Sequence, residues 1–349
     1  MGQNLTLTDL EPLARARIDP DWYEYFASGA ATETALRENV EAFRRVRLRQ
    51  RVLRGIEHVD TTTTILGHPV AHPIVAAPIA YQAFAHAEAE AGVARGVTRL
   101  GGAMCLSTFS NLSAAEVAAA APDGLRFLQV YVFRDHGVTD TLIAQAVELG
   151  YRAVVLTVDL PIPGPRDREL RIHWTFPEDS IPAVRFALDH GVEADGLGIV
   201  DPTLDWEYVS HLVETAGVPV VVKGILEPED ARLAFEHGAA GIVVSNHGGR
   251  QLDNAPATID VLPSIVDAVA DRGEVYLDSG IRRGADVFAA LALGARAVLA
   301  GRLPLWGLAI DGADGVAAAI GLLRDELSTT MHLTGCSEIS EIGHHCLLG

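Results

Sequence analysis

A histidine in a glycine-rich segment is the residue whose setting most directly suggests chemistry. His247 follows the apolar run 241–245 and is itself followed by two glycines and Arg250. A histidine that titrates near neutral pH, beside a cationic anchor, is what abstraction of a proton from an anionic substrate requires. The spacing therefore predicts a general base at His247 and an anion-binding group at Arg250. Asp159, which ends the run 153–159, is a candidate to stabilise the imidazolium, with a helix-cap or turn role as the alternative.

Lys223 stands out because the chain has almost no other use for lysine. Lys plus Arg is 27, and Lys223 is the one lysine among them. It ends the apolar run 219–223, and an incidental surface lysine is the alternative interpretation. A compact ammonium that can lose its proton or lie beside a planar ring cannot be replaced by a guanidinium fork. We therefore interpret Lys223 as a functional residue.

Two glycine–arginine pairs near the end of the chain have the chemistry of a phosphate site. Gly280 with Arg282 and Gly301 with Arg302 follow the last two apolar runs. Glycines let backbone N–H groups approach phosphate oxygens, and arginines add charge-assisted hydrogen bonds. The alternative is that the glycines only make tight turns. Because the chain as a whole is strongly acidic, with a net charge of −19, we interpret these paired arginines as a phosphate site.

Eight short apolar runs would position these residues. Each run is too short for a helix and too uniformly apolar for a half-exposed strand, which is typical of parallel strands buried on both faces. The segments between them, such as 113–121, 139–149, 228–236 and 285–293, have apolar residues at helical spacing. This alternation predicts an α/β protein with a (β/α)8 TIM barrel. An open doubly wound sheet is the alternative, but its GxGxxG motif is absent. The runs are 74–79, 103–107, 126–131, 153–159, 219–223, 241–245, 275–279 and 297–301.

The remaining segments extend this single barrel domain, residues 74–349. Residues 1–73 form an N-terminal extension in which 7–17, 20–27 and 32–45 are expected helices. A small hairpin is expected at 61–66 and 69–70, around Gly67 and His68. The one long connection, about 160–218, follows the fourth strand and is expected to be a partly ordered lid, because it contains Trp174, Phe176, Phe186 and Trp206.

In such barrels the active site lies at the carboxyl ends of the strands. Those ends carry hydroxyl, amide, acidic, lysine, histidine and arginine side chains, whereas the opposite ends carry little comparable. We therefore expect one mouth that includes Pro78, Ile79, Ala80, Ser107, Gln129, Tyr131, Thr157, Asp159, Lys223, Ser245, His247, Arg250, Asp278, Gly280, Arg282, Gly301 and Arg302.

Composition excludes several classes of protein. The net charge of −19 repels nucleic acid and anionic lipid, so neither is an expected partner. Three cysteines without CxxC spacing make neither a disulfide framework nor a zinc site, and no metal is expected. The chain has no GxSxG hydrolase motif, no 18-residue apolar run and no signal-peptide pattern. These features predict a cytoplasmic protein.

One motif resembles a known family signature. Residues 245–253, Ser-Asn-His-Gly-Gly-Arg-Gln-Leu-Asp, are similar to the signature of the FMN-dependent 2-hydroxy acid oxidases and dehydrogenases. That group includes glycolate, lactate and hydroxymandelate oxidases. The resemblance extends over about residues 7–342, and its further matches are 25–30, 62–67, 156–159, 223–224 and 282–287.

The resemblance implies an FMN cofactor and a role for each candidate residue. Arg282, Arg302 and backbone near Gly280 and Gly301 would hold the FMN phosphate, and Lys223 would lie near the pyrimidine side of the ring. His247 would be the base, with Asp159 behind it, and Tyr131 would bind the substrate hydroxyl. Arg166 and Arg250 would bind the substrate carboxylate, with a hydrogen bond from Tyr25. The other cofactor residues would be Pro78, Ile79, Ala80, Ser107, Gln129, Thr157, Ser245 and Asp278.

The expected reaction is oxidation of an (S)-2-hydroxy acid to the 2-oxo acid, with O2 as acceptor and H2O2 as product. Tyr81 and Phe109 suit a mandelate-like or other bulky substrate, with ordinary packing as the alternative. Three other hypotheses stay open: a soluble dehydrogenase with another acceptor, a flavin-free barrel isomerase or aldolase using Lys223, and a flavin-binding protein without redox activity. The resemblance also suggests a homo-oligomer, a tetramer or octamer.

The chain departs from the family pattern at several positions. Phe109 replaces a tryptophan, Pro165 an arginine, Ser279 a glycine and Leu303 a proline. The connection after the fourth strand is also shorter than in most relatives. These differences lie around the expected pocket, so the identity of the substrate is the least determined part of the interpretation.

Overall fold

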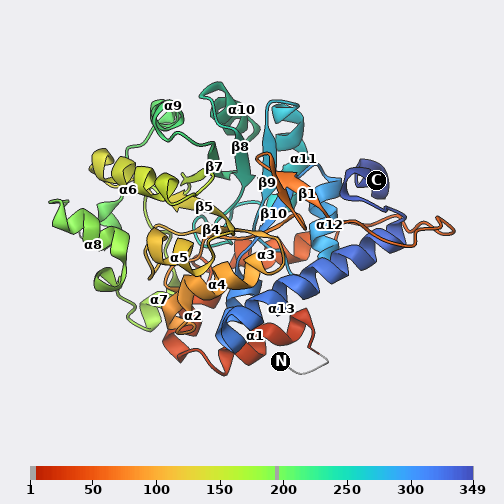
Figure 1. The fold of residues 1–349 in the computed structure, drawn as a ribbon, viewed down its shortest axis with the longest axis horizontal. Coiled ribbons are helices and arrows are strands. Elements are labelled where there is room, and N and C mark those ends of the chain that lie inside the picture. The colour runs from red at the N-terminus through yellow and green to blue at the C-terminus, as the bar shows by residue number, and fades with distance from the viewer. Residues whose placement is uncertain (1–4, 193–195, 349) are drawn as a thin grey trace.

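A closed barrel of eight parallel strands lies at the centre of the protein (Figure 1). The computed structural model describes residues 5–192 and 196–348. Each strand pairs with the next along the chain, and the last closes on the first. The predicted (β/α)8 barrel is thus confirmed, and the open sheet is excluded. The strands are β3 (Ile74–Ala76), β4 (Ala103–Leu106), β5 (Leu125–Val130), β6 (Val154–Thr157), β7 (Val220–Ile225), β8 (Gly241–Val244), β9 (Glu274–Leu277) and β10 (Ala297–Ala300).

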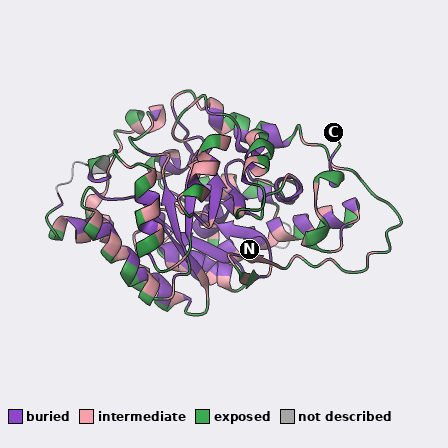
Figure 2. Ribbon diagram, turned by 90° about the horizontal axis from the view of Figure 1, so that it is seen from above, coloured by how far each residue is buried: buried purple, intermediate pink, exposed green. Residues whose placement is uncertain are grey.

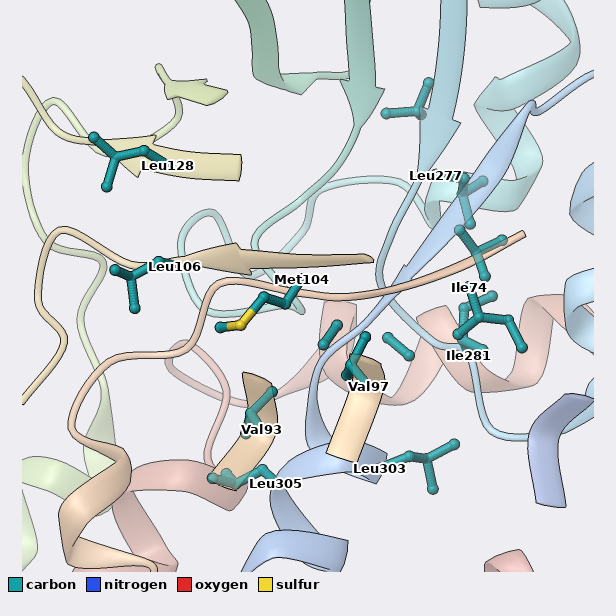
Figure 3. Packing of buried hydrophobic residues seen from close by; sticks show 14 of the residues in the cluster. Ile74, Val93, Val97, Met104, Leu106, Leu128, Leu277, Ile281, Leu303 and Leu305 are labelled. Atoms are coloured by element: carbon teal, nitrogen blue, oxygen red, sulfur yellow. The ribbon is translucent and has the colours of Figure 1, made fainter. Parts of the chain in front are cut away.

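The strands are buried on both faces, as their apolar sequences require (Figure 2). Side chains of one parity, such as Phe127, Val155 and Val221, form a small inner cluster to which each of the eight barrel strands contributes. Side chains of the other parity join the larger core beneath the helices. Figure 3 shows part of that larger core, to which Val93, Val97, Leu303 and Leu305 belong. The barrel is therefore filled, and only its ends are available to a ligand.

Helices cover the outside of the barrel. The predicted helical segments are confirmed within three residues at each end. The covering helices are α4 (Ala89–Thr98), α5 (Ala114–Ala120), α6 (His136–Glu148), α10 (Pro228–Glu236), α11 (Thr258–Val269), α12 (Gly284–Ala292) and α13 (Arg302–Thr334), with short 3-10 turns η2 (Gln82–Phe84), η5 (Ile339–Glu341) and η6 (His344–Cys346).

The last helix, α13, is long and apolar enough to cross a membrane by length and composition alone. Most of its apolar stretch is buried inside the protein, and the helix packs against α4, α12 and α1. It is also interrupted, since Asp311 and Gly312 have non-helical backbone angles. These contacts are those of a core helix, and length and composition are weak evidence for a span.

The N-terminal extension packs on the barrel. It contains η1 (Leu7–Asp9), α1 (Leu10–Arg15), α2 (Pro20–Ala27), α3 (Thr34–Phe43) and the hairpin β1 (Thr63–Ile65) with β2 (His68–Val70). The third helix begins two residues later than expected, because Glu33 has a left-handed φ of 62°. A carboxylate from a distant loop caps this helix. Asp253 Oδ1 accepts hydrogen bonds from the backbone N–H groups of Thr34 (2.7 Å) and Ala35 (3.3 Å).

The long connection after β6 is ordered over most of its length. Its elements are α7 (Asp167–Arg171), η3 (Glu178–Ser180), α8 (Pro182–Asp189), η4 (Gly196–Ile199) and α9 (Trp206–Thr215). Residues 193–195 of the predicted lid lie outside the described residues. Arg168 fastens α7 to the N-terminal extension, because its guanidinium pairs with Glu24 (3.2 Å) and Glu33 (2.7 Å).

Loss of the Asp253 cap should weaken the attachment of the extension. We expect Asp253→Ala to lower the free energy of unfolding by about 1 kcal/mol, the usual cost of removing a helix N-cap. Asp253→Asn should retain most of that energy, since an amide oxygen can still accept. The measurement is urea unfolding, with the exposed Asp271→Ala as the control. Equal effects of the two alanine variants would contradict the cap.

Candidate active site

The alternation along each strand determines which side chains reach the mouth of the barrel. Phe127 and Val221 belong to the small inner cluster. Two residues further along the same strands, Gln129 and Lys223 have the same parity and therefore point inward, at the carboxyl end. The same step leads from the inner core to Ser107, Thr157, Ser245 and Asp278. The sequence thus places polar groups on one end of a filled barrel.

One pocket at this end contains nearly all of the predicted site residues. Asp159 and Ser245 are the exceptions, and they contact lining residues from behind. The predicted residues that line the pocket are Tyr25, Pro78, Ile79, Ala80, Ser107, Gln129, Tyr131, Thr157, Arg166, Lys223, His247, Arg250, Asp278, Gly280, Arg282, Gly301 and Arg302.

His247 is held between a carboxylate and a phenol. Its Nδ1 lies 2.8 Å from Asp159 Oδ1, and its Nε2 lies 3.2 Å from the hydroxyl of Tyr131. Burial lowers the pKa of His247, Lys223 adds to the effect, and Asp159 opposes it without reversing it. Burial raises the pKa of Asp159, but His247 and Lys223 outweigh it, so the net pKa is lowered. The pair is therefore a neutral imidazole and a carboxylate.

This protonation pattern places the lone pair of His247 on Nε2, which faces the hydroxyl of Tyr131 in the pocket. A carboxylate only accepts, so Nδ1 carries the imidazole proton and Nε2 is the acceptor. Burial raises the pKa of Tyr131, which keeps its hydroxyl protonated and able to donate. His247 has a left-handed φ of 59°, a strained conformation that is common at functional sites. The geometry is that of a general base with its supporting acid.

Lys223 is a buried ammonium in an ion pair. Its Nζ donates to Ser245 Oγ (3.0 Å) and lies 3.3 Å from Asp278 Oδ2. Burial lowers the pKa of Lys223, but Asp278 and Asp159 outweigh that effect, so the net pKa is raised. A charged lysine can stabilise negative charge on a neighbouring ring. It is poorly suited to attack a carbonyl as a free amine.

Arg282 and Arg302 face the pocket without a carboxylate partner. Among the described residues, neither guanidinium forms a salt bridge, and Arg302 donates only to the backbone oxygens of Phe26, Ser28 and Gly248. Burial, together with the neighbouring Arg282 and Arg250, lowers the pKa of Arg302 to about 9. A bound anion would relieve this repulsion.

The backbone beside these arginines packs closely against other segments of the same protein. Gly280 has φ of 92°, and a Cβ there would clash with the carbonyl oxygen of Asn39. Ser279, also left-handed at φ 71°, accepts a hydrogen bond from the Gly248 N–H (2.9 Å) and donates to Asp278 (2.7 Å). The loops after β8 and β9 are thereby fixed to each other at the predicted phosphate site.

Two buried polar atoms of the pocket fit a flavin ring. Gln129 Nε2 and Thr157 Oγ1 have no hydrogen-bond partner among the described residues. An unsatisfied buried polar group costs about 1–3 kcal/mol, so a partner is expected. The pyrimidine edge of an isoalloxazine offers both carbonyl acceptors and an N–H donor. These atoms, the ammonium of Lys223 and the two unpaired arginines together suit FMN.

Arg166 and Arg250 meet at the roof of the pocket. Arg250 Nη1 donates to the backbone oxygens of Tyr25 (2.7 Å) and Ser28 (2.9 Å), and its guanidinium lies 4.8 Å from the centre of the Tyr25 ring. Arg166 Nε donates to the backbone oxygen of Arg250 (3.2 Å). Both guanidinium groups also bind Glu169 of α7. The predicted carboxylate site is therefore assembled from three distant segments.

Sequence reasoning missed several pocket residues. Leu160 and Trp174 line the pocket but were not predicted to do so. Glu169, which is not itself a lining residue but binds the lining arginines Arg166 and Arg250, was not predicted either. Trp174 stacks on Tyr25, with ring centres 4.9 Å apart, and Tyr81 lies parallel to Phe109 at 6.5 Å. These rings form an aromatic wall of Tyr25, Tyr81, Phe109 and Trp174. Charge alternation and aromatic clustering in the connection after β6 were the available signals, but neither fixes a position in space.

The phosphate assignment predicts a selective loss of cofactor affinity. Arg282→Gln should weaken FMN binding by roughly 10- to 100-fold, because a charged hydrogen bond contributes about 1.5–3 kcal/mol. Riboflavin, which lacks the phosphate, should lose little affinity. Flavin fluorescence titration measures both. Arg283→Gln is the matched control, since Arg283 is half-exposed and pairs with Glu326 instead. An equal loss for riboflavin would contradict the assignment.

Known proteins resemble this chain over nearly its whole length. A family model described as FMN-dependent dehydrogenase matches residues 14–348. Human 2-hydroxyacid oxidase 1 is 41% identical over 350 residues, which cover 97% of this chain and 95% of the relative. An L-lactate oxidase of Nostoc is 41% identical over 355 residues, covering 97% of this chain and 96% of the relative.

Solved structures agree in fold as well as in sequence. A lactate oxidase described as putative, from Pediococcus acidilactici, superposes with a TM-score of 0.94 at 38% identity, covering 99% of this chain and 95% of its own. A mandelate oxidase with (S)-2-phenylpropionate gives a TM-score of 0.89 at 40% identity, covering 97% and 96%. The chain therefore belongs to the FMN-dependent dehydrogenase family, whose 2-hydroxy acid oxidases are its relatives and whose cofactor is FMN.

Proposed function

We propose that the enzyme oxidises an (S)-2-hydroxy acid with a bulky side chain to the 2-oxo acid, and that O2 accepts the electrons to give H2O2. The observation that carries the proposal is the meeting of a neutral imidazole with two guanidinium groups in one pocket. We also propose that the enzyme is cytoplasmic and that it assembles as a homo-oligomer.

His247 and its two partners provide the group that accepts a proton from the substrate. His247 Nε2 accepts a proton from the substrate, and the Asp159 carboxylate stabilises the imidazolium that results. The Tyr131 hydroxyl, 3.2 Å from Nε2, orients the substrate oxygen. The same three residues serve removal of a proton from the α-carbon and removal of a proton from the hydroxyl.

The positively charged side chains of the pocket balance the negative charge of the substrate and the cofactor. Arg166 and Arg250 bind the carboxylate and reduce its opposition to further negative charge at the α-carbon. When bound, FMN supplies the two-electron acceptor. Lys223 would hold the ring from beside it and supply a positive charge that offsets negative charge there, and its raised pKa keeps it charged for this role. The same raised pKa disfavours the flavin-free isomerase or aldolase, which needs a neutral lysine.

The aromatic wall supports a bulky substrate side chain. Tyr81 is almost fully buried yet lines the pocket with Phe109, Tyr25 and Trp174. Aromatic rings pack favourably against a further ring or branched apolar group. The mandelate oxidase among the structural relatives is consistent with such a substrate, and the relatives named as oxidases support O2 as acceptor.

A substrate screen tests the proposal directly. The FMN-loaded enzyme should bleach under anaerobic conditions with (S)-mandelate and should form H2O2 in air. Glycolate and (S)-lactate should react with lower kcat/KM than mandelate. Bleaching without formation of H2O2 would indicate that the electron acceptor is a compound other than O2. Absence of bleaching with every 2-hydroxy acid would refute the reaction itself.

The role of His247 can be measured separately. His247→Gln should slow anaerobic flavin reduction by roughly 10²- to 10⁴-fold, the usual contribution of a general base, with FMN retained. Stopped-flow absorbance measures the rate. His136→Gln is the control, because His136 also pairs with a carboxylate, Asp201 at 2.7 Å, but lies outside the pocket. Similar rates for the two variants would contradict the assignment.

The pH dependence follows from the lowered pKa of His247. Only the neutral imidazole can accept a proton, so reduction should fail as the pH drops through that pKa. Because the pKa lies below its ordinary value of about 6.5, the rate of reduction should stay constant through neutral pH and decline only under more acidic conditions. A decline centred above that value would contradict the electrostatic argument.

A further inference from the structure

A carboxylate of the protein itself occupies part of the arginine pair. Glu169 Oε1 lies 2.9 Å from Arg166 Nη1 and 3.1 Å from Arg250 Nη2, and its Oε2 lies 3.2 Å from Arg166 Nη1. The three side chains are only 8–14% exposed. At this burial, the charges are poorly screened by solvent, so their sum matters to any ligand.

The contacts leave donors for a second carboxylate. Among the described residues, Arg166 Nη2 makes no hydrogen bond, and Arg250 Nη2 makes only the one to Glu169. Both arginines line the pocket. A substrate carboxylate can therefore bind while Glu169 stays in place.

The position of Glu169 is fixed by its helix. Arg168, the preceding residue, pairs with Glu24 and Glu33 of the N-terminal extension. Trp174, just after α7, stacks on Tyr25. These contacts hold α7 over the mouth, so that Glu169 is a built part of the site.

We propose that Glu169 is a specificity-determining residue that limits the substrate to a single carboxylate. Two guanidinium groups and Glu169 carry a net charge of one positive unit, which one substrate carboxylate neutralises. A 2-hydroxy dicarboxylate would add an uncompensated negative charge in a poorly solvated place. The inference rests on the proposed function for the role of Arg166 and Arg250 as the carboxylate site.

Two non-reacting probes of the same shape test the inference. Succinate and succinamate differ by one charge, and neither carries the hydroxyl that is oxidised. Calorimetric titration of the FMN-loaded enzyme gives a dissociation constant for each. The wild type should prefer succinamate. Glu169→Gln should shift the ratio of the two constants toward succinate by roughly tenfold, the effect of one charge at short range in a partly solvated site.

Two further variants separate charge from shape. Asp167→Asn makes the same change of charge on the same helix, but Asp167 is half-exposed and 3.8 Å from Arg171, so the ratio should not move. Glu169→Asp keeps the charge with a shorter reach, and should keep the ratio while both probes bind more weakly.

The other outcomes overturn the inference. Equal tightening of both probes in Glu169→Gln would make Glu169 a simple competitor for the arginines. Equal weakening would make it only a structural support. Binding of neither probe to wild type would remove the arginine pair as a carboxylate site. The substrate screen is read independently, because bleaching by a 2-hydroxy acid reports the reaction and not its charge selectivity.

Discussion

The concentration of positive charge at one end of the barrel is the constraint on which the site depends. Five permanent cations line a single pocket: Lys223, Arg166, Arg250, Arg282 and Arg302. Partly buried like charges repel unless they are neutralised. The carboxylate of Asp278 forms an ion pair with Lys223, and that of Glu169 forms ion pairs with Arg166 and Arg250. Arg282 and Arg302 have no carboxylate partner among the described residues, which supports the prediction that they hold the cofactor phosphate. On that prediction, the protein's own charges would divide the pocket into a phosphate end and a carboxylate end.

Holding these groups in place requires loops that are unusually constrained. Tyr81, His247 and Ser279 follow three different strands, and each has a left-handed backbone that side chains seldom adopt. Such a conformation costs of order 1 kcal/mol or more per residue. Contacts of these loops with neighbouring elements offset that cost, among them the reciprocal amide pair between Asn39 of α3 and Asn246 (2.8 and 2.7 Å). The N-terminal extension thus belongs to the machinery of the site.

The barrel was predictable because its information is local. An apolar run such as 153–159 indicates a buried strand without information from the rest of the chain. The alternation of side chains along the strands then places Thr157 and Lys223 at the mouth of the barrel. The partnership of His247 with Asp159 follows from the same logic. Glu169 was not predictable in this way, because its partner Arg250 is 81 residues away and their meeting depends on the path of the connection after β6. The cap of α3 by Asp253 was missed for the same reason, since it joins residues more than 200 positions apart.

The pocket draws on almost the full length of the chain. Tyr25 and Phe26 come from the second helix, whereas Arg302 begins the last long one, and Arg302 donates directly to the backbone of Phe26 and Ser28. During synthesis on the ribosome, the segment that carries Tyr25 therefore emerges long before its partner exists. A pocket that includes both segments can form only after Arg302 has been synthesised, and a chain that stops short of α13 lacks one of the two arginines predicted to bind the cofactor phosphate.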